Sequence, residues 1–339
     1  MGNPRNTILI RTCVLVSLFL SIPGSSDIAR AQSDRKLEIL QIRPNFYMIA
    51  HAGCNIALQT GPDGAVLVDA GSGASSDQVV AEIKKLTDQP IRYIINTGAD
   101  ADHIGGNEEL AKAGQSIFAT GTTPLGGEVG KVMTNGFAAS ILATSNVLAR
   151  MSAPSGQNPP FPGPSWPTET FDGPRTFIYF NHEGIEVFHE PAAHSDADSI
   201  VFFRASDVIA TGEIVDTTRF PIIDVEKGGS IQGEIDALNH VIQLAVRPIP
   251  FIYQGQGAGT YIVPGHGQIY QQADVVEYRD MIVTIRDIIA DMIQRKMTLK
   301  QIESASPAKA FEREYGAESG PWTTNDFVDA VYQSLTGKK

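Results

Sequence analysis

The chain has 339 residues, 42% hydrophobic and 19% charged, which is typical of a globular protein with one large domain or two ordinary ones. Its formal net charge is -12. No compact basic patch is visible, and binding to nucleic acid or to an anionic membrane requires clustered lysine and arginine, so we expect neither partner.

The first 31 residues have the pattern of an export signal. Arg5 and Arg11 precede an apolar run at 13–22, and residues 29–31 read Ala-Arg-Ala, a small-x-small cleavage pattern. The run is too short for a membrane-spanning helix, which needs about 20 apolar residues. We therefore expect cleavage after Ala31, a periplasmic or secreted protein, and no membrane anchor in the mature chain.

Cys54 is the one cysteine that remains once the signal, with Cys13, is removed. A single cysteine cannot form an internal disulfide, so the apolar core must stabilise the fold. Cys54 lies in a run that reads as a buried strand. A small buried apolar side chain is the favoured interpretation, with a nucleophile or metal ligand as the alternative.

The amino-terminal third reads as strands followed by alternating helices and strands. Short apolar runs separated by turn residues predict consecutive antiparallel strands at 37–42, 46–51, 54–60 and 65–69. A helix at 76–87, a strand at 91–95 and a helix at 108–114 follow. The loop at 96–107 thus lies at the carboxyl end of a strand, where ligand sites gather in open α/β sheets.

The middle of the chain predicts an insertion at 120–174. Residues 120–150 suggest a glycine-interrupted helical segment, and 152–174 form a proline-rich loop that is either disordered or a lid.

A second block of strands is predicted at 176–180, 185–190, 199–204 and 207–211, then a helix at 231–246 and a strand at 260–263. We expect one domain over 32–270. Residues 271–339 are predicted to be a helical extension packed on that domain, with an apolar stripe that fits a dimer contact equally well. The extension includes a capping box at Thr298 and Gln301.

Three of the seven histidines share a setting that suggests chemistry. His103, His194 and His266 each follow a predicted strand and lie in a loop of small residues, so their rings can face a shared cleft. His51 and His189 lie in or beside strands and can edge the cleft, but structural roles are favoured for both.

The order of motifs from about Ile42 to Gly267 resembles the metallo-β-lactamase-fold metallo-hydrolase superfamily. The shared motifs are Gly-Cys-Asn at 53–55, Val-Asp-Ala-Gly at 68–71, Asp-His-Ile-Gly-Gly-Asn at 102–107, His-Ser-Asp-Ala-Asp at 194–198, Thr-Gly-Glu at 211–213 and Pro-Gly-His-Gly at 264–267. The resemblance implies an α/β fold, a four-layer αββα sandwich with a metal cleft at the edge of two sheets. The family's His-x-His-x-Asp-His is altered here to Gly-x-Asp-x-Asp-His, with Gly98 and Asp100 in place of two histidines.

The resemblance also implies two metal positions. One would be held by Asp102, His103 and His266 with a bridging carboxylate, for which Glu213 is favoured over Asp216.

Of the three histidines at the other position only His194 remains, supplemented by Asp100 and Glu213. Asp69 and Asp198 look like the family's loop-buttressing carboxylates, which orient ligands through hydrogen bonds.

Coordination chemistry makes the first of these positions self-sufficient. A catalytic zinc site needs about three protein ligands and a water, which Asp102, His103 and His266 satisfy. The other position is rich in oxygen and poor in histidine, which shifts preference towards iron or manganese. We expect a divalent metal, zinc first, with one ion favoured and two or none as the alternatives.

The predicted function is an exported metal-dependent hydrolase that uses metal-activated water on an ester, thioester, lactone or amide bond of a small molecule. Asp102 would orient the nucleophile, and the insertion would set substrate choice. The alternative is a non-catalytic periplasmic binding or scaffold protein with a degenerate metal site. An iron-dependent redox member ranks last, because no flavin-binding segment is visible. The oligomeric state stays open.

Overall fold

The structure is a computed structural model that describes residues 36–116, 138–152, 157–248 and 259–337. The predicted signal at 1–31 and residues 120–137 of the predicted insertion lie outside the described residues. Among the helices within these ranges, none is long and apolar enough to cross a membrane.

The first half of the chain forms a seven-stranded sheet in which sequence order equals spatial order. The strands are β1 (Glu38–Arg43), β2 (Phe46–Ala50), β3 (Ile56–Gln59), β4 (Ala65–Val68), β5 (Ile91–Ile95), β6 (Ser140–Thr144) and β7 (Glu169–Phe171). Pairs up to β3–β4 are antiparallel, and pairs from β4–β5 onward are parallel. The carboxyl ends of β4, β5 and β6 therefore lie at one edge.

The second sheet has five strands in the order β12-β11-β10-β9-β8. These are β8 (Arg175–Phe180), β9 (Glu183–Glu190), β10 (Asp198–Phe203), β11 (Val208–Ala210) and β12 (Tyr261–Val263). The pairs from β8 to β11 are antiparallel, whereas β11 and β12 are parallel. The parallel pair places the segments after β11 and β12 side by side.

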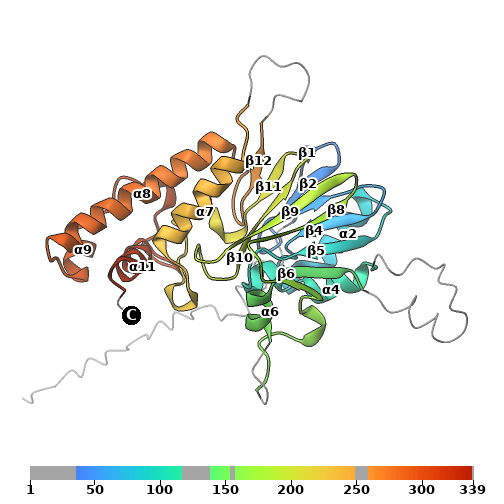
Figure 1. Cartoon of the computed structure of the whole chain (residues 1–339), viewed down its shortest axis with the longest axis horizontal. Coiled ribbons are helices and arrows are strands. Elements are labelled where there is room, and N and C mark those ends of the chain that lie inside the picture. Colours follow the sequence, from blue (N-terminus) through green and yellow to red (C-terminus); the bar gives the residue numbers. More distant parts are fainter. Residues whose placement is uncertain (1–35, 117–137, 153–156, 249–258, 338–339) are drawn as a thin grey trace, which may run out of the picture.

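Helices cover both outer faces (Figure 1). The α-helices are α2 (Ser76–Leu86), α3 (Ala101–Ile104), α4 (Asn107–Ala113), α6 (Ser145–Met151), α7 (Ile231–Leu244), α8 (Gln272–Gln294), α9 (Leu299–Ala305), α10 (Glu312–Tyr315) and α11 (Thr324–Thr336). Short 3₁₀ turns occur at η1 (Gly73–Ser75), η3 (Gly163–Ser165), η4 (Gly212–Ile214) and η5 (Val225–Lys227).

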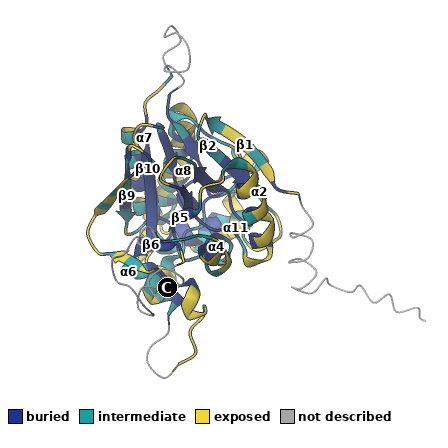
Figure 2. Cartoon of the chain, turned by 90° about the vertical axis from the view of Figure 1, so that its right-hand side faces the viewer, coloured by how far each residue is buried: buried dark blue, intermediate teal, exposed yellow. Residues whose placement is uncertain are grey.

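Successive side chains of the central strands point to opposite faces of the sheet and so pack in two different layers of the core. In β4, Val66 and Val68 pack between the two sheets, whereas Ala65 and Leu67 pack under α2 and α4. A third core fills the space between the second sheet and α7, α8 and α11. Figure 2 shows the inner strands such as β5 and β10 as buried, whereas the edge strand β1 and the outer faces of the helices are partly exposed. The predicted four-layer αββα sandwich is confirmed.

Two segments differ from their predicted conformations. Residues 140–144 form β6 instead of belonging to a helical insertion, and 169–171 form β7 within the predicted loop. The run in β6 is only five residues long and is buried throughout, so periodicity alone cannot distinguish a strand from a helix there. Pairing with β5 decides the conformation.

The tail follows its sequence pattern. The apolar stripe of α8 is buried against α7 and α11, with Met292 at its less buried end. Thr298 and Gln301 form the predicted capping box at the start of α9.

Candidate metal centre

Asp102 and His103 lie together on α3, directly after the loop that follows β5. Asp100 is the N-cap residue, and its carbonyl accepts hydrogen bonds from the backbone N–H groups of His103 and Ile104. His103 is fully buried, whereas the Asp102 side chain is 39% exposed. The loop thus presents one imidazole from inside the sandwich and one carboxylate from its open edge.

Asp69, at the end of β4, orients His103. Its carboxylate accepts hydrogen bonds from the backbone N–H of Thr97 at 2.8 Å, from the Thr97 hydroxyl at 2.7 Å and from His103 Nδ1 at 2.8 Å. Donation from Nδ1 to Asp69 leaves Nε2 as the atom that faces the centre. Asp69, for which the resemblance implied a buttressing role, thus hydrogen-bonds both His103 and the loop that begins at Thr97.

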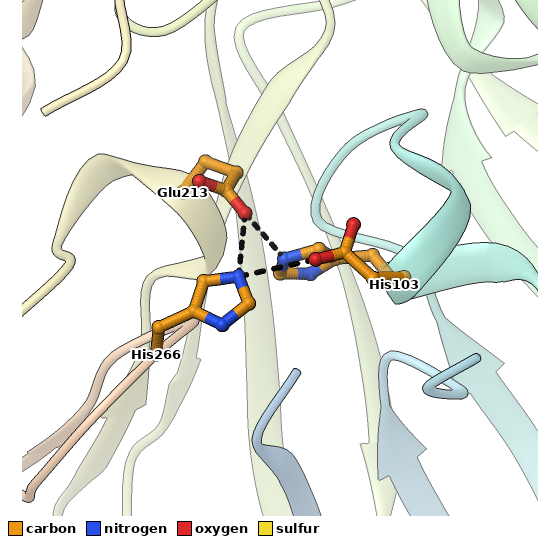
Figure 3. Close-up of side chains that lie close together, drawn as sticks. His103, Glu213 and His266 are labelled. Carbon is orange, nitrogen blue, oxygen red and sulfur yellow. Dashed lines mark hydrogen bonds and ion pairs between the residues drawn. The ribbon is translucent and has the colours of Figure 1, made fainter. Parts of the chain in front are cut away.

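Glu213 lies in the turn after β11 and contacts one histidine from a loop of each sheet. Its Oε1 lies 2.8 Å from His103 Nε2 and 2.9 Å from His266 Nε2. Figure 3 marks both contacts with dashed lines. Burial by itself raises the pKa of Glu213, but the hydrogen bonds with the two histidines overcome that effect and hold the pKa well below its usual value. Glu213 is an ionised carboxylate at neutral pH.

His266 reaches the centre from the loop after β12. Its Nε2 also lies 3.3 Å from Asp102 Oδ2. Burial lowers the pKa of His266, but Asp102 and Glu213 outweigh it and raise the pKa to about 9 in the metal-free protein. The loop itself is held by Asn55, whose side-chain amide donates to the carbonyls of Pro264 and Gly267 at 3.0 Å each.

The donor set fits a divalent metal ion. The ligand atoms of Asp102, His103, Glu213 and His266 all lie within 4.8 Å of one another. Zinc held at 2.0–2.2 Å by tetrahedral donors separates those donors by about 3.3–3.6 Å. The three closest pairs here are 2.8, 2.9 and 3.3 Å apart, so small outward shifts admit an ion. Two imidazoles and two carboxylates are the donors that zinc, iron and manganese accept.

Of the residues predicted for the other position, Glu213 belongs to this group, whereas His194 and Asp100 lie beside it without joining it. His194 Nδ1 is 3.4 Å from Asp198 and 3.7 Å from Asp100. Among the described residues, neither Asp100 nor His194 belongs to the group of donors within 4.8 Å. Asp198 also accepts a hydrogen bond from the backbone N–H of Ser195 at 2.6 Å, which holds the loop that carries His194.

Asp216, the alternative to Glu213 as the bridging carboxylate, makes its contacts within its own loop. One of its carboxylate oxygens accepts from Arg219 Nε at 2.5 Å, and the other accepts from the backbone and hydroxyl of Thr218. Its carboxylate is therefore occupied by its own loop, while Glu213 contacts both histidines.

Three further residues neighbour the centre: Cys54, Asn55 and Arg219. Cys54 is buried, as predicted, but it lies before β3 instead of within it, and its sulfur is within 4.8 Å of donor atoms of Asp69 and His103. Burial raises the pKa of its thiol to about 11, so it is neutral. Asn55 carried a signal in the Gly-Cys-Asn motif, whereas Arg219 had none.

The chain is thus an α/β protein with two stacked sheets, and two histidines and two carboxylates gather at the edge of those sheets. Residues 51–251 match the family model described as the metallo-beta-lactamase superfamily, and the chain belongs to that family.

Sulfatases and a lactamase are among the proteins to which the chain is similar. Over 247 residues the chain is 25% identical to a linear primary-alkylsulfatase from Pseudomonas sp. (strain ATCC 19151), covering 68% of this chain and 44% of that protein. The fold is similar to an inverting sec-alkylsulfatase from Pseudomonas sp., with a TM-score of 0.57, 12% identity and coverage of 92% and 52%. The chain thus spans about half the length of these sulfatases.

A metallo-beta-lactamase from Pontibacter korlensis has a TM-score of 0.51 at 14% identity, covering 73% of this chain and 99% of that one. At these low identities the structural similarities show only that the folds are alike.

Proposed function

We propose that the chain is an exported hydrolase with one catalytic divalent metal ion, zinc being favoured, that acts on a small-molecule substrate. The observation that carries the proposal is the convergence of Asp102, His103, Glu213 and His266 from three separate loops on one point. Export rests on the pattern of residues 1–31. Iron or manganese is the alternative metal, since the donor set alone does not select among these ions.

The residues of the centre have distinct roles in this proposal. When bound, the metal supplies an activated water and polarises the scissile bond. Asp102, His103, His266 and Glu213 would hold the ion. Burial raises the pKa of Asp102, but its hydrogen bond with His266 and the charge of His103 outweigh burial and lower the pKa, so Asp102 is an ionised acceptor that orients the attacking water.

The bond that is cleaved is proposed to be an ester, thioester, lactone or amide. A sulfate ester is a second candidate, because the relative that shares 25% identity is a linear primary-alkylsulfatase. A panel of short alkyl acetates, thioesters, lactones, amides and alkyl sulfates, assayed with zinc-loaded protein, separates these classes. A protein that binds zinc but turns over nothing in the panel matches the alternative of a non-catalytic binding or scaffold protein.

Metal analysis of the purified protein tests the centre directly. We expect about one equivalent of metal, lost in His103→Ala and in His266→Ala. His240→Ala is the matched control, because His240 also contacts a carboxylate, Glu190 at 2.6 Å, away from the centre. A folded protein without metal, whose stability a chelator leaves unchanged, contradicts the proposal.

A comparison of two variants tests whether Glu213 or Asp216 is the metal-binding carboxylate. Glu213→Gln keeps the side-chain shape but removes the charge between the two histidines, so metal content should fall. Asp216→Asn should leave metal content unchanged, because Asp216 contacts Arg219 and Thr218. The reverse result makes Asp216 the ligand.

A further inference from the structure

A cavity of about 250 Å³ opens beside the candidate metal centre. Its wall is shared by the β2–β3 loop, the segment after β11 and the His266 loop. The lining residues are Ala50, His51, Gly53, Cys54, Asn55, Thr218, His266 and Gly267. Because His266 belongs both to the metal centre and to this wall, the cavity adjoins the place where a bond would be cleaved.

Two titratable side chains of this wall, His51 and Cys54, are not used by the proposed metal centre, and the Cys54 thiol is buried and neutral, which leaves His51. Its backbone is left-handed, with φ of 68°, at the end of β2. Non-glycine residues rarely adopt this conformation, and where they do, the strain concentrates at functional sites. The side chain is 42% exposed and lies 3.7 Å from Glu38, which is itself 73% exposed. The imidazole is therefore free to contact a ligand.

The loop that carries His51 is packed on the metal-binding loop. Ser72 N–H donates to the carbonyl of Ala52 at 2.7 Å. A Cβ on Gly53, whose φ is 111°, would lie 2.7 Å from Ser72 N and 3.0 Å from the carbonyl oxygen of Asp102. Only glycine permits this approach. His51 is thus held in a fixed place relative to Asp102, as a group that acts on a substrate must be.

We propose that this cavity binds the leaving-group half of the substrate and that His51 donates the proton which the departing oxygen needs. The proposal rests on the hydrolase function above and extends it to a substrate class. The cavity is smaller than the roughly 300–1,000 Å³ of pockets for drug-sized ligands. Ala50 and Cys54 supply an apolar part of its wall, and His51, Asn55, Thr218 and His266 supply a polar part that can contact an oxygen. An ester of a short alkyl alcohol fits these features.

The step balances as a simple hydrolysis. The water oxygen bonds to the acyl carbon, and the bond from that carbon to the alkoxy oxygen breaks. The alkoxy oxygen takes a proton from the His51 imidazolium and leaves as the alcohol. The proton that the water loses returns to His51 through solvent, so an ester and a water become an acid and an alcohol.

A binding experiment tests the contact without depending on turnover. Ethyl methylphosphonate places an ethoxy oxygen where the leaving group would lie, and its affinity for the zinc-loaded full chain can be measured by NMR titration. His51→Asn keeps a residue that tolerates the left-handed backbone but removes the imidazole. We expect about tenfold weaker binding in this variant, the effect of losing one hydrogen bond to a charged ligand.

His182→Asn is the matched control, because His182 is also a left-handed, exposed histidine, in the β8–β9 turn away from the cavity. It should bind the phosphonate like the unchanged protein. Equal affinity in His51→Asn and in the control overturns the inference.

A pair of substrates of similar size tests proton donation. Ethyl acetate has a poor leaving group, whereas 2,2,2-trifluoroethyl acetate releases a far more acidic alcohol that needs little protonation. In His51→Asn we expect kcat to fall by about 100-fold with ethyl acetate, in the range for general acid catalysis, and less than about threefold with the fluorinated ester. Equal losses for both esters overturn the role of proton donor.

Zinc binding, measured by chelator competition in all variants, distinguishes failure of the hydrolase proposal from failure of the inference about His51. If the unchanged protein binds no metal, the hydrolase proposal fails. If zinc binds equally well in every variant while His51→Asn leaves both the phosphonate affinity and the leaving-group dependence unchanged, only the inference about His51 fails.

Discussion

Gly98 occupies a position with room for a side chain. A Cβ there would lie 3.6 Å from an Asp198 oxygen and 3.7 Å from an Asp100 oxygen, which is ordinary van der Waals contact, and the backbone is not left-handed. Other glycines at the centre differ, since a Cβ on Gly212 would lie 2.2 Å from the Thr97 hydroxyl. The backbone at position 98 therefore has room for the Cβ of a larger residue.

Restoring the two histidines should restore a second metal position. In the double variant Gly98→His and Asp100→His, the new imidazoles join His194 to supply three nitrogen ligands. We expect metal content to rise from about one to about two equivalents, measured by elemental analysis after dialysis against zinc. Gly163→His is a control, because nothing lies within 4 Å of a Cβ at that position. An unchanged content of one equivalent contradicts the prediction.

The charged histidines predict how the metal-free protein responds to pH. Burial lowers the pKa of His194, but Asp198 and Asp100 raise it to about 9, as Asp102 and Glu213 do for His266. A histidine whose pKa is raised from 6.5 on folding stabilises the fold fully below about pH 6.5 and loses that contribution as the pH rises to about 9.

The urea midpoint of the metal-free protein should therefore fall between pH 6.5 and 9, more than that of the zinc-loaded protein, in which a ligand histidine has already lost its proton. Zinc affinity should rise over the same interval, up to tenfold per pH unit for each proton released. Chelator competition checks the second point. A zinc affinity that does not change over this range contradicts both.

Helix α7 carries an unusual buried group on the face that packs beneath the His194 loop. Glu234 is fully buried, and among the described residues neither of its carboxylate oxygens has a hydrogen-bond partner. Burial, and then the charge of Asp198, raise the pKa of Glu234 well above its usual value. The side chain is a neutral acid in the folded protein.

Glu234→Gln should stabilise the protein in a pH-dependent way. Unfolded glutamate ionises above about pH 4.5, whereas the folded group keeps its proton, so folding must take up a proton at a cost that grows with pH. Glutamine is neutral in both states. We expect a gain in the free energy of unfolding at pH 8 that shrinks towards pH 4, measured by urea denaturation. Glu82→Gln, on the surface beside Lys85, should show no such trend.

The carboxyl-terminal extension is joined to the metal centre through Phe220. Its ring stacks on Phe327 with centroids 4.9 Å apart, and its N–H donates to the carbonyl of Tyr315 at 3.0 Å. Three residues earlier, Thr217 N–H donates to the carbonyl of His266 at 3.1 Å. One short segment thus contacts both the extension and a ligand loop, although the family match ends at residue 251.

Phe220→Ala should weaken the fold and the metal site together. Truncation of a buried phenylalanine costs about 3–5 kcal/mol of stability, and here the loss falls on the segment that supports His266. Phe203→Ala is the control, since Phe203 is equally buried but packs on Phe46 between the sheets. Both variants should lower the urea midpoint, and only Phe220→Ala should lower zinc affinity. Equal zinc affinities in the two variants contradict this link.

The sequence by itself predicted most of the strands and helices that form the layers and the set of candidate metal ligands, because both depend on local patterns. Strand alternation, the apolar stripe of α8 and the ordered motifs around His103, His194 and His266 are legible in consecutive residues. The conformation of some short segments could not be predicted from their sequence. Ser140–Thr144 is a strand because β5 lies beside it, and its sequence alone does not carry that information.

Tertiary structure decided which candidates meet. Glu213 and Asp216 are three residues apart, and only the resemblance favoured Glu213. The turn at η4 directs Glu213 to the two histidines, while Arg219 contacts Asp216. The same holds for His51, which joins His266 in one wall only after the chain has folded. Ligand geometry depends on loops brought together from distant strands, and no local pattern encodes those distances.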